Sequence, residues 1–152
     1  MTALEKQQIS DSLGPVLNAH GVYFIDLVIR GHQGRRVFEL YIDSDSGVST
    51  DTCAEVSREV GPLIERLNSR RDDYTLVVSS PGLDRPLRFP RQYRKHIGYR
   101  LIVKWNDAGE SRKAEGILEK VDEAFLLLRT DDEKEIAISF ERVVEARVKP
   151  RW

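Results

Sequence analysis

The beginning of the chain carries apolar residues at the spacing of one helix face. This recurrence predicts a helix that buries one stripe of its surface. Gly14 and Pro15 interrupt the pattern and predict a kink or a break, because proline lacks the backbone donor that a helix interior needs. Gly21 predicts the end of the helix. The apolar positions are Leu4, Ile9, Leu13, Val16 and Leu17.

Two runs of alternating apolar and polar residues follow, at residues 22–30 and 35–43. The four-residue link between them includes Gly31 and Gly34, so the pattern predicts a β-hairpin. The same four residues match the Gly-x-x-Gly loop of KH RNA-binding domains, in which the loop joins two helices and clamps phosphates. Here the link joins two predicted strands, which favours a turn that uses glycine for positive φ.

A second helix is predicted after the polar loop at residues 43–47. Ser49 is the expected N-cap, and Asp51 stands in the first turn, where the helix dipole favours an acid. Gly61 and Pro62 threaten the middle of this helix. A third strand is predicted at residues 75–78, and the connection before it is long enough for a crossover. The apolar stripe of the helix is Cys53, Val56, Val60, Leu63, Ile64 and Leu67.

The remainder of the chain reads as short strands separated by polar turns. Strands are predicted at residues 99–105, 113–121, 124–129, 135–138 and 143–148, with short helical turns at residues 90–96. This spacing is typical of a small closed barrel, and the tight turn at residues 139–142 is analogous to that of SH3-like barrels. The predicted fold class is α+β: an N-terminal αββαβ domain with a mixed sheet (residues 1–86), followed by a small SH3-like β-barrel domain (residues 87–152).

The joint between the two predicted domains is a proline-rich loop, in which Pro81 cannot donate to a sheet and Pro-Gly marks a turn. Its residues are Ser79, Ser80, Pro81, Gly82, Leu83, Asp84, Arg85 and Pro86. With Leu87, this loop closely resembles the signature of the bacterial ribosome maturation factor RimP family. Matches in family order run from Gly21 to Pro150, and the signature is their most specific part. They include Tyr41-Ile42-Asp43, Gly47-Val48-Ser49, Cys53-Ala54-Glu55-Val56-Ser57-Arg58 and the ending Ala146-Arg147-Val148-Lys149-Pro150.

The resemblance implies an assembly factor without catalytic activity. Such a factor binds the immature or free small ribosomal subunit in the cytoplasm, including its rRNA and the twelfth small-subunit ribosomal protein, and promotes late assembly. It implies no cofactor and no metal, and we expect a monomer that does not bind membranes. Two features depart from the family pattern: Gly61-Pro62 within an otherwise uninterrupted helix, and the polar residues 69–73.

Composition limits how the chain can bind nucleic acid. The 152 residues carry a net charge of −1, which is far from the basic bulk of a general nucleic-acid binder, so any RNA contact must come from a local patch. No apolar run approaches the roughly 20 residues that span a bilayer. The start of the chain lacks the apolar core of a secretory signal. Cys53 is the only cysteine, which suits a reducing cytosol.

Residues 85–104 form such a patch, with seven basic residues and no acid. Basic side chains neutralise phosphates, and the interleaved Phe89, Tyr93 and Tyr99 could stack on unpaired bases. The alternative is that the three rings fill the domain joint while the charges are merely solvated. The predicted ribosome- or RNA-binding residues are Arg85, Arg88, Arg91, Arg94, Lys95, Arg100 and Lys104. Contact with a ribosomal protein is predicted for Lys104, Arg112, Lys113, Arg147 and Lys149.

The signature loop has two interpretations. Asp84 caps a turn and Arg85 pairs with it to brace the joint, or the loop braces the joint and also contacts a partner. Two rival functions also remain, a general single-stranded RNA-binding module and an enzyme. The enzyme finds little support, because His20, His32 and His96 fall in different predicted elements and show no metal-ligand spacing. Cys53 lies on an apolar stripe, and residues 131–133 read as a solvated turn.

Overall fold

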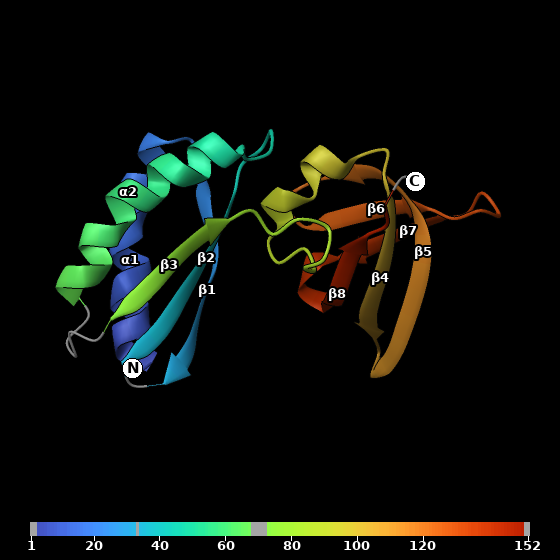
Figure 1. The fold of residues 1–152 in the computed structure, drawn as a ribbon. Coiled ribbons are helices and arrows are strands. Elements are labelled where there is room, and N and C mark those ends of the chain that lie inside the picture. Colours follow the sequence, from blue (N-terminus) through green and yellow to red (C-terminus); the bar gives the residue numbers. More distant parts are fainter. Residues whose placement is uncertain (1–2, 33, 68–72, 151–152) are drawn as a thin grey trace. The chain divides into compact units, whose positions relative to one another are not determined.

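The computed structural model describes residues 3–32, 34–67 and 73–150 (Figure 1). The chain divides into two compact units, residues 1–81 and residues 82–152. The domain boundary expected after Pro86 stays a prediction. Most of the link at residues 69–73, where the sequence departs from the family pattern, lies outside the described residues.

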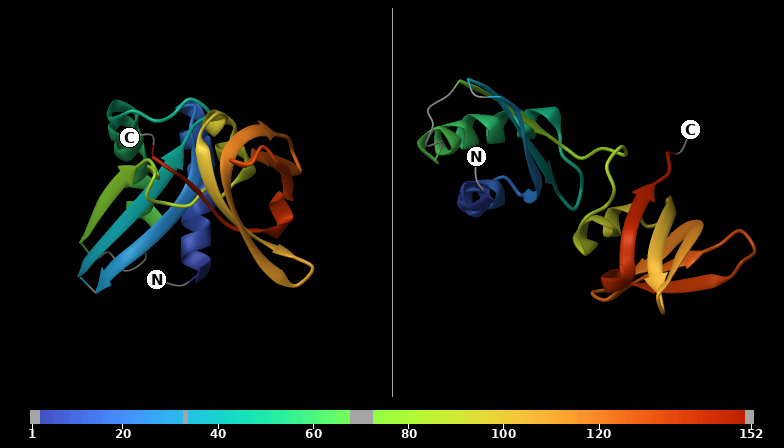
Figure 2. Two further views of the ribbon diagram at one scale, coloured as in Figure 1. Left: turned by 90° about the vertical axis from the view of Figure 1, so that its right-hand side faces the viewer. Right: turned by 90° about the horizontal axis from the view of Figure 1, so that it is seen from below.

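The first unit is an αββαβ arrangement with a mixed sheet, as predicted. Its sheet has the order β1-β2-β3, in which β1 and β2 are antiparallel and β2 and β3 are parallel. Both helices lie on the same face of this sheet (Figure 2). The elements are α1 (Ala3–Ala19), β1 (Tyr23–His32), β2 (Arg35–Asp43), α2 (Thr50–Leu67) and β3 (Tyr74–Ser79).

Both helices continue through the prolines that were expected to interrupt them. Pro15 lies inside α1 and Pro62 inside α2, so of the kink or break predicted at Gly14-Pro15 the break does not occur. The packed core explains the continuity, because most helix stability in proteins comes from tertiary packing rather than from propensity. Leu13 and Leu17 flank Pro15, Val60 and Ile64 flank Pro62, and all four side chains are fully or almost fully buried.

The ends of the helices follow their sequence signals. Gly21 has φ +70°, and the amide nitrogens of Gly21 and Val22 donate to carbonyl oxygens of the last turn of α1. At the start of α2, the Ser49 hydroxyl accepts a hydrogen bond from the Thr52 amide at 3.1 Å. The predicted helix end and N-cap are therefore confirmed.

The hairpin between β1 and β2 is tighter than the predicted four-residue link. The antiparallel register continues through the pairs Gly31 with Arg36 and His32 with Arg35. Gly31 has φ +97°, and a Cβ there would lie 2.1 Å from the Arg35 carbonyl oxygen. Only glycine allows this close approach of the two backbones. Gly31 is therefore a strand residue, which supports the hairpin interpretation over a KH-type loop.

The second unit contains a five-stranded antiparallel sheet in the order β7-β6-β5-β4-β8. The predictions of several short strands and of helical turns before them are confirmed, whereas closure of the strands into a barrel is not seen among the described residues. Among the described residues β7 and β8 are the two ends of the strand order, and no pairing joins them. The strands are β4 (Arg100–Asp107), β5 (Glu110–Val121), β6 (Phe125–Arg129), β7 (Glu135–Ser139) and β8 (Val143–Val148). The 3-10 turns are η1 (Pro90–Gln92), η2 (Arg94–His96) and η3 (Phe140–Arg142).

The inner face of this sheet forms a separate hydrophobic core. Leu101, Val103, Leu118, Leu126 and Leu128 are completely buried in it. Their alternation with outward residues fixes which side chains each strand presents to solvent. Neither of the described α-helices has the length and apolar character needed to cross a membrane.

Candidate functional site

The signature loop is tied to β8 within the second unit. The Leu87 amide donates to the Ala146 carbonyl oxygen at 2.7 Å. The Arg147 guanidinium donates to the Asp84 carbonyl oxygen, also at 2.7 Å. Arg147 therefore braces the loop, a contact that the sequence did not reveal because the two residues are 63 positions apart. The pairing of Arg85 with Asp84 stays a prediction.

The segment after the loop is held by a buried glutamine. The Gln92 side-chain oxygen accepts hydrogen bonds from the amides of Arg88 at 2.7 Å and Phe89 at 2.8 Å. The Gln92 residue is fully buried. A buried polar group with satisfied hydrogen bonds fixes the conformation of the chain around it. The positions of the nearby basic residues are therefore set by the fold.

The three aromatic residues of the basic run have different roles. Tyr93 is 2% exposed and lies edge-on to Phe140, with ring centroids 4.9 Å apart. Burial raises the pKa of the Tyr93 hydroxyl. The prediction that Tyr93 stacks on bases is therefore wrong, because its ring belongs to the core. Tyr99 is half-buried beside His96, and the Arg88 guanidinium lies 5.3 Å from the centroid of the Phe89 ring.

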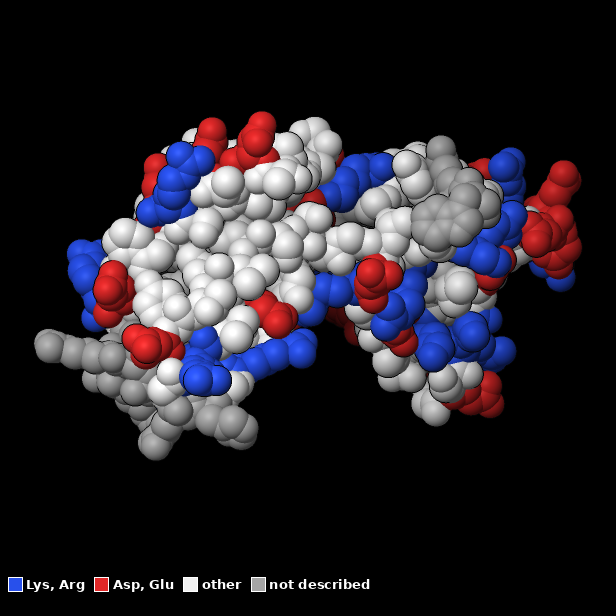
Figure 3. Space-filling model, viewed as in Figure 1, with Lys and Arg blue, Asp and Glu red and all other residues white. Residues whose placement is uncertain are grey.

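Strand β4 lies between β5 and β8, and its outward residues form the centre of a charged surface. Lys104 is directly opposite Lys113 on β5 and Glu145 on β8. Residues directly opposite on antiparallel strands lie on the same side of the sheet. We call this surface the β4 face; Lys and Arg side chains gather over β4 and β8 in Figure 3, with acids among them. Its charged residues are Arg100, Lys104, Lys113, Glu115, Glu145, Arg147 and Lys149.

Acidic residues from other strands partly neutralise the β4 face. Glu115 lies 3.4 Å from both the Arg100 guanidinium and the Lys149 ammonium. Asp131, in the exposed turn predicted at residues 131–133, lies 3.1 Å from the Arg100 guanidinium. The run of residues 85–104 contains no acid in sequence. In the folded protein, however, acidic residues from other segments lie beside Arg100 and Lys104, the last two basic residues of the run.

Glu145, on β8, is the second acidic residue of the β4 face. Its carboxylate lies 2.5 Å from the Arg147 guanidinium and 3.7 Å from the Lys104 ammonium. The hydrogen bond from Arg147 is the main cause that lowers the pKa of Glu145. With five basic and two acidic residues, the β4 face nevertheless keeps an excess of positive charge.

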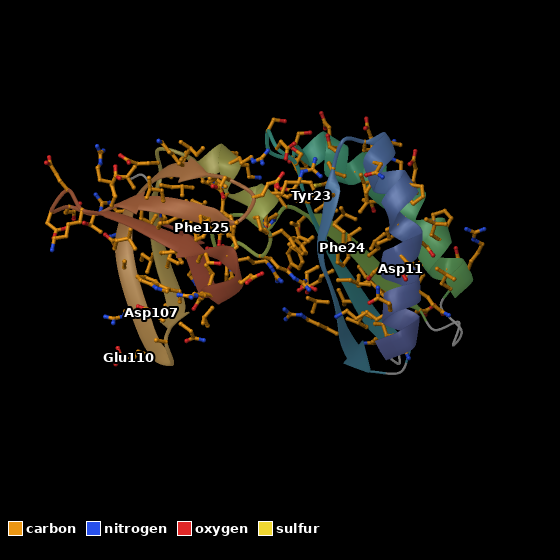
Figure 4. All side chains as sticks on the ribbon, turned by 180° about the vertical axis from the view of Figure 1, so that it is seen from behind. Asp11, Tyr23, Phe24, Asp107, Glu110 and Phe125 are labelled. Carbon is orange, nitrogen blue, oxygen red and sulfur yellow. The ribbon has the colours of Figure 1, made fainter. Side chains whose placement is uncertain are left out.

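Arg112 stands apart from the other residues predicted to contact a ribosomal protein. It pairs with Asp107 at 3.3 Å and with Glu110 at 3.2 Å. Figure 4 labels both acids at the end of the β4–β5 hairpin. The structure thus joins Lys104, Lys113, Arg147 and Lys149 to Arg100 on one surface and leaves Arg112 outside it. The residues predicted to bind RNA and those predicted to contact a ribosomal protein therefore share one surface.

The remaining basic residues of the run precede β4. Arg85, Arg88, Arg91, Arg94 and Lys95 all belong to the second unit. Arg94 in η2 and Lys113 in β5 are exposed, and neither makes an ion pair within the described ranges. An exposed cation without an internal partner is the kind that can neutralise a phosphate at low cost.

Two other kinds of site, a metal site and a reactive cysteine, can be checked in the part of the chain that the structure describes. No cluster of three or more His, Cys, Asp or Glu residues could hold a metal ion there. Cys53 packs at the edge of the first core, and burial raises the pKa of its thiol. A raised pKa disfavours the thiolate that a nucleophile needs. Cys53 is therefore a core residue, as predicted.

The chain is an α+β protein of two compact units, and the second unit carries the β4 face with its excess of positive charge. Comparison with known proteins is more specific. The RimP N-terminal domain matches residues 12–84. The ribosome maturation factor RimP of Cytophaga hutchinsonii is 36% identical over 132 residues, which are 86% of this chain and 77% of that relative. The chain belongs to the RimP family, which confirms the resemblance seen in the sequence.

Proposed function

We propose that this protein is a ribosome maturation factor. It binds the free or immature small ribosomal subunit in the cytoplasm, promotes late assembly and catalyses no reaction. The observation that carries the proposal is the 36% identity to the ribosome maturation factor RimP of Cytophaga hutchinsonii, across most of both chains. The positively charged β4 face supports the proposal, because it supplies the local patch that a nearly neutral chain needs to contact rRNA.

The β4 face and the segment before it are the proposed rRNA-contacting surface. Its cations are partly neutralised by Glu115 and Glu145, which limits its affinity for RNA in general. A partly neutralised patch binds reversibly, whereas a strongly basic surface would bind all RNA. Reversible binding suits a factor that must leave the mature subunit. Asp84 and Leu87, at the end of the signature loop, are proposed to support this surface through their contacts with β8.

The twelfth small-subunit ribosomal protein is the proposed protein partner. The sequence assigned this contact to Lys104, Arg112, Lys113, Arg147 and Lys149, which all lie in the second unit. Because four of these residues share the β4 face with Arg100, rRNA and the ribosomal protein would meet the same surface. The factor would act as a monomer.

Co-sedimentation tests the proposal. The full chain would be centrifuged with free small subunits, with whole ribosomes and with a free structured RNA, each at two salt concentrations. We expect selective binding to free small subunits. Equal binding to every RNA, with a steep loss of affinity in salt, would instead identify a general RNA-binding module. Absence of binding to all three would overturn both functions.

A further inference from the structure

An apolar groove lies on the second unit, at the outer side of β5, β6 and β7. Its volume is about 610 Å³, and apolar side chains dominate its lining, including Ile97, Val121, Phe125, Leu127 and Ala137. Ile97 and Phe125 are each 47% exposed, so two of the five exposed large apolar residues in the described ranges meet here. Figure 4 labels Phe125, which lies on β6 away from the hairpin end marked by Asp107 and Glu110. Apolar surface gathered in this way marks an interaction site more often than scattered apolar residues do.

Within the described ranges, two of the three charged side chains that line the groove already have partners in the protein. Glu119 lies 3.2 Å from the Arg129 guanidinium. Asp122 accepts hydrogen bonds from the amides of Ala124 at 2.8 Å and Phe125 at 2.7 Å. A small polar ligand needs convergent hydrogen-bonding groups to orient it. This groove offers apolar area instead, which suits an apolar side chain of a protein.

The charge around the groove differs from that of the β4 face. Among the described residues, Glu119, Asp122 and the single base Lys120 are the charged residues that line the groove, and Glu123 stands next to Asp122 at the turn between β5 and β6. The two amide hydrogen bonds lower the pKa of Asp122, so its carboxylate stays ionised at neutral pH. Because Arg129 pairs with Glu119, Asp122 and Glu123 against Lys120 leave a slight negative excess at this end of the groove. Phosphates are disfavoured here, and Lys or Arg beside an apolar anchor would complement this turn.

We propose that the groove binds an apolar side chain from a segment of a partner protein that carries Lys or Arg next to that side chain. This goes beyond the proposed function, because it assigns a protein ligand to a surface other than the β4 face. It does not depend on the ribosomal role, since the groove can be tested with a peptide alone.

The test is an NMR titration of the full, isotope-labelled chain. The probes are a short capped peptide of leucines flanked by lysines, the same peptide with glutamates in place of the lysines, and a short oligouridylate. We expect saturable shifts of the Val121, Leu127 and Ala137 amides with the lysine peptide and weaker binding of the glutamate peptide. No saturable shift at these residues with the lysine peptide would overturn the proposal. Equal binding of the two peptides, or binding of the oligouridylate in the groove, would also overturn it.

A matched pair of variants localises the effect. Phe125→Ser should weaken binding of the lysine peptide about tenfold, because an aromatic ring supplies much of the contact area of such a groove. Val144→Ser removes an apolar side chain that is 63% exposed on β8 and should leave the affinity unchanged. A spectrum with wild-type dispersion shows that each variant is folded. An equal loss of affinity for the lysine peptide in both variants would contradict binding in the groove. Co-sedimentation with small subunits reports separately on the proposed function.

Discussion

The two halves of β5 carry different surfaces on one continuous strand. The first half presents Lys113 and Glu115 to the β4 face, where charges from three strands lie side by side. The second half borders the apolar groove with Glu119 and Val121. The charged half borders β4, whereas the apolar half borders β6. The partner strand, rather than the local composition of β5, decides which kind of surface each half belongs to.

This difference shows how a nearly neutral sheet can present two kinds of binding surface. On the β4 face, acids and bases from three strands are mixed and leave a moderate positive excess that favours phosphate. At the groove, the charged groups are bound internally or stand at the rim, so apolar contact dominates. Variants that act on one surface and spare the other therefore test the comparison directly.

The largest expected effect comes from Leu118, which lies on the inner side of β5 between the two surfaces. Its side chain is completely buried in the second core. Leu118→Ala should destabilise the second unit by about 2–5 kcal/mol, since it removes buried methylenes and leaves a cavity. RNA binding and peptide binding should then be lost together as the unit unfolds. Urea unfolding followed by circular dichroism, with both binding assays at each denaturant concentration, measures this.

Leu40→Ala is the matched control, because Leu40 is equally buried in the core of the first unit. It should destabilise the first unit by a similar amount and leave the amide spectrum of the second unit unchanged. If Leu118→Ala abolished only one of the two binding activities, the two surfaces would not depend on a shared core. The comparison between the halves of β5 would then fail.

The next largest effect concerns the acids of the β4 face. Glu115→Gln with Glu145→Gln removes the carboxylates that pair with Arg100, Lys104, Arg147 and Lys149. We expect stronger binding of small subunits and of free RNA, with a salt dependence steeper by up to about two units of slope. Binding of the lysine peptide at the groove should not change. Weaker RNA binding in this variant would show that the acids position the cations rather than neutralise them.

A smaller effect separates paired cations from unpaired ones. Lys113 is exposed and makes no ion pair within the described ranges, whereas Arg112 is paired with Asp107 and Glu110. Lys113→Gln should reduce the salt slope of RNA binding by about 0.7–0.9, the contribution of one phosphate contact. Arg112→Gln should leave the slope nearly unchanged. Equal reductions in both variants, measured by fluorescence anisotropy at several salt concentrations, would place Arg112 on the binding surface as well.

Much of the fold followed from local patterns in the sequence. Strand β2 was predicted from the alternation through Phe38, Leu40 and Ile42. The start of α2 was predicted from the cap at Ser49. The continuity of the helices at Pro15 and Pro62 did not follow, because packing against the core outweighs the local cost of proline. Local signals describe the preferences of a segment, whereas its neighbours in space decide the outcome.

The candidate site was less predictable, since it depends on contacts between distant residues. The basic run was visible in the sequence, but Glu115, Asp131 and Glu145 reach it only through strand pairing. The sequence did not show that Tyr93 is buried, because its ring packs against Phe140, which is distant in the chain. The groove residues come from three strands, from the turn between β5 and β6 and from Ile97 after η2, so no short motif marks them. The strand register, which brings these distant residues together, could not be predicted from the sequence.

The smallest expected effect is a difference in how the two surfaces titrate. Arg147 is the main cause that lowers the pKa of Glu145 below its ordinary 4.5, and Lys104 contributes less. A group whose pKa is lower in the folded state adds stability above its unfolded pKa, and this stability is lost as pH falls through the folded pKa. The contribution of Glu145 should therefore disappear only below pH 4.5.

Arg147→Gln should raise the pKa of Glu145 toward that ordinary value, and Lys104→Gln should raise it less. Asp122 at the groove should titrate as in the wild type in both variants, because backbone amides lower its pKa. Added salt should distinguish the two carboxylates in the same way, since it screens exposed ion pairs more than hydrogen bonds to the protein's own amides. Carboxyl-carbon NMR titration of the full chain measures both pKa values. A parallel rise of the two in Arg147→Gln would mean that one long-range field governs the whole sheet, and the separation between the halves of β5 would be lost.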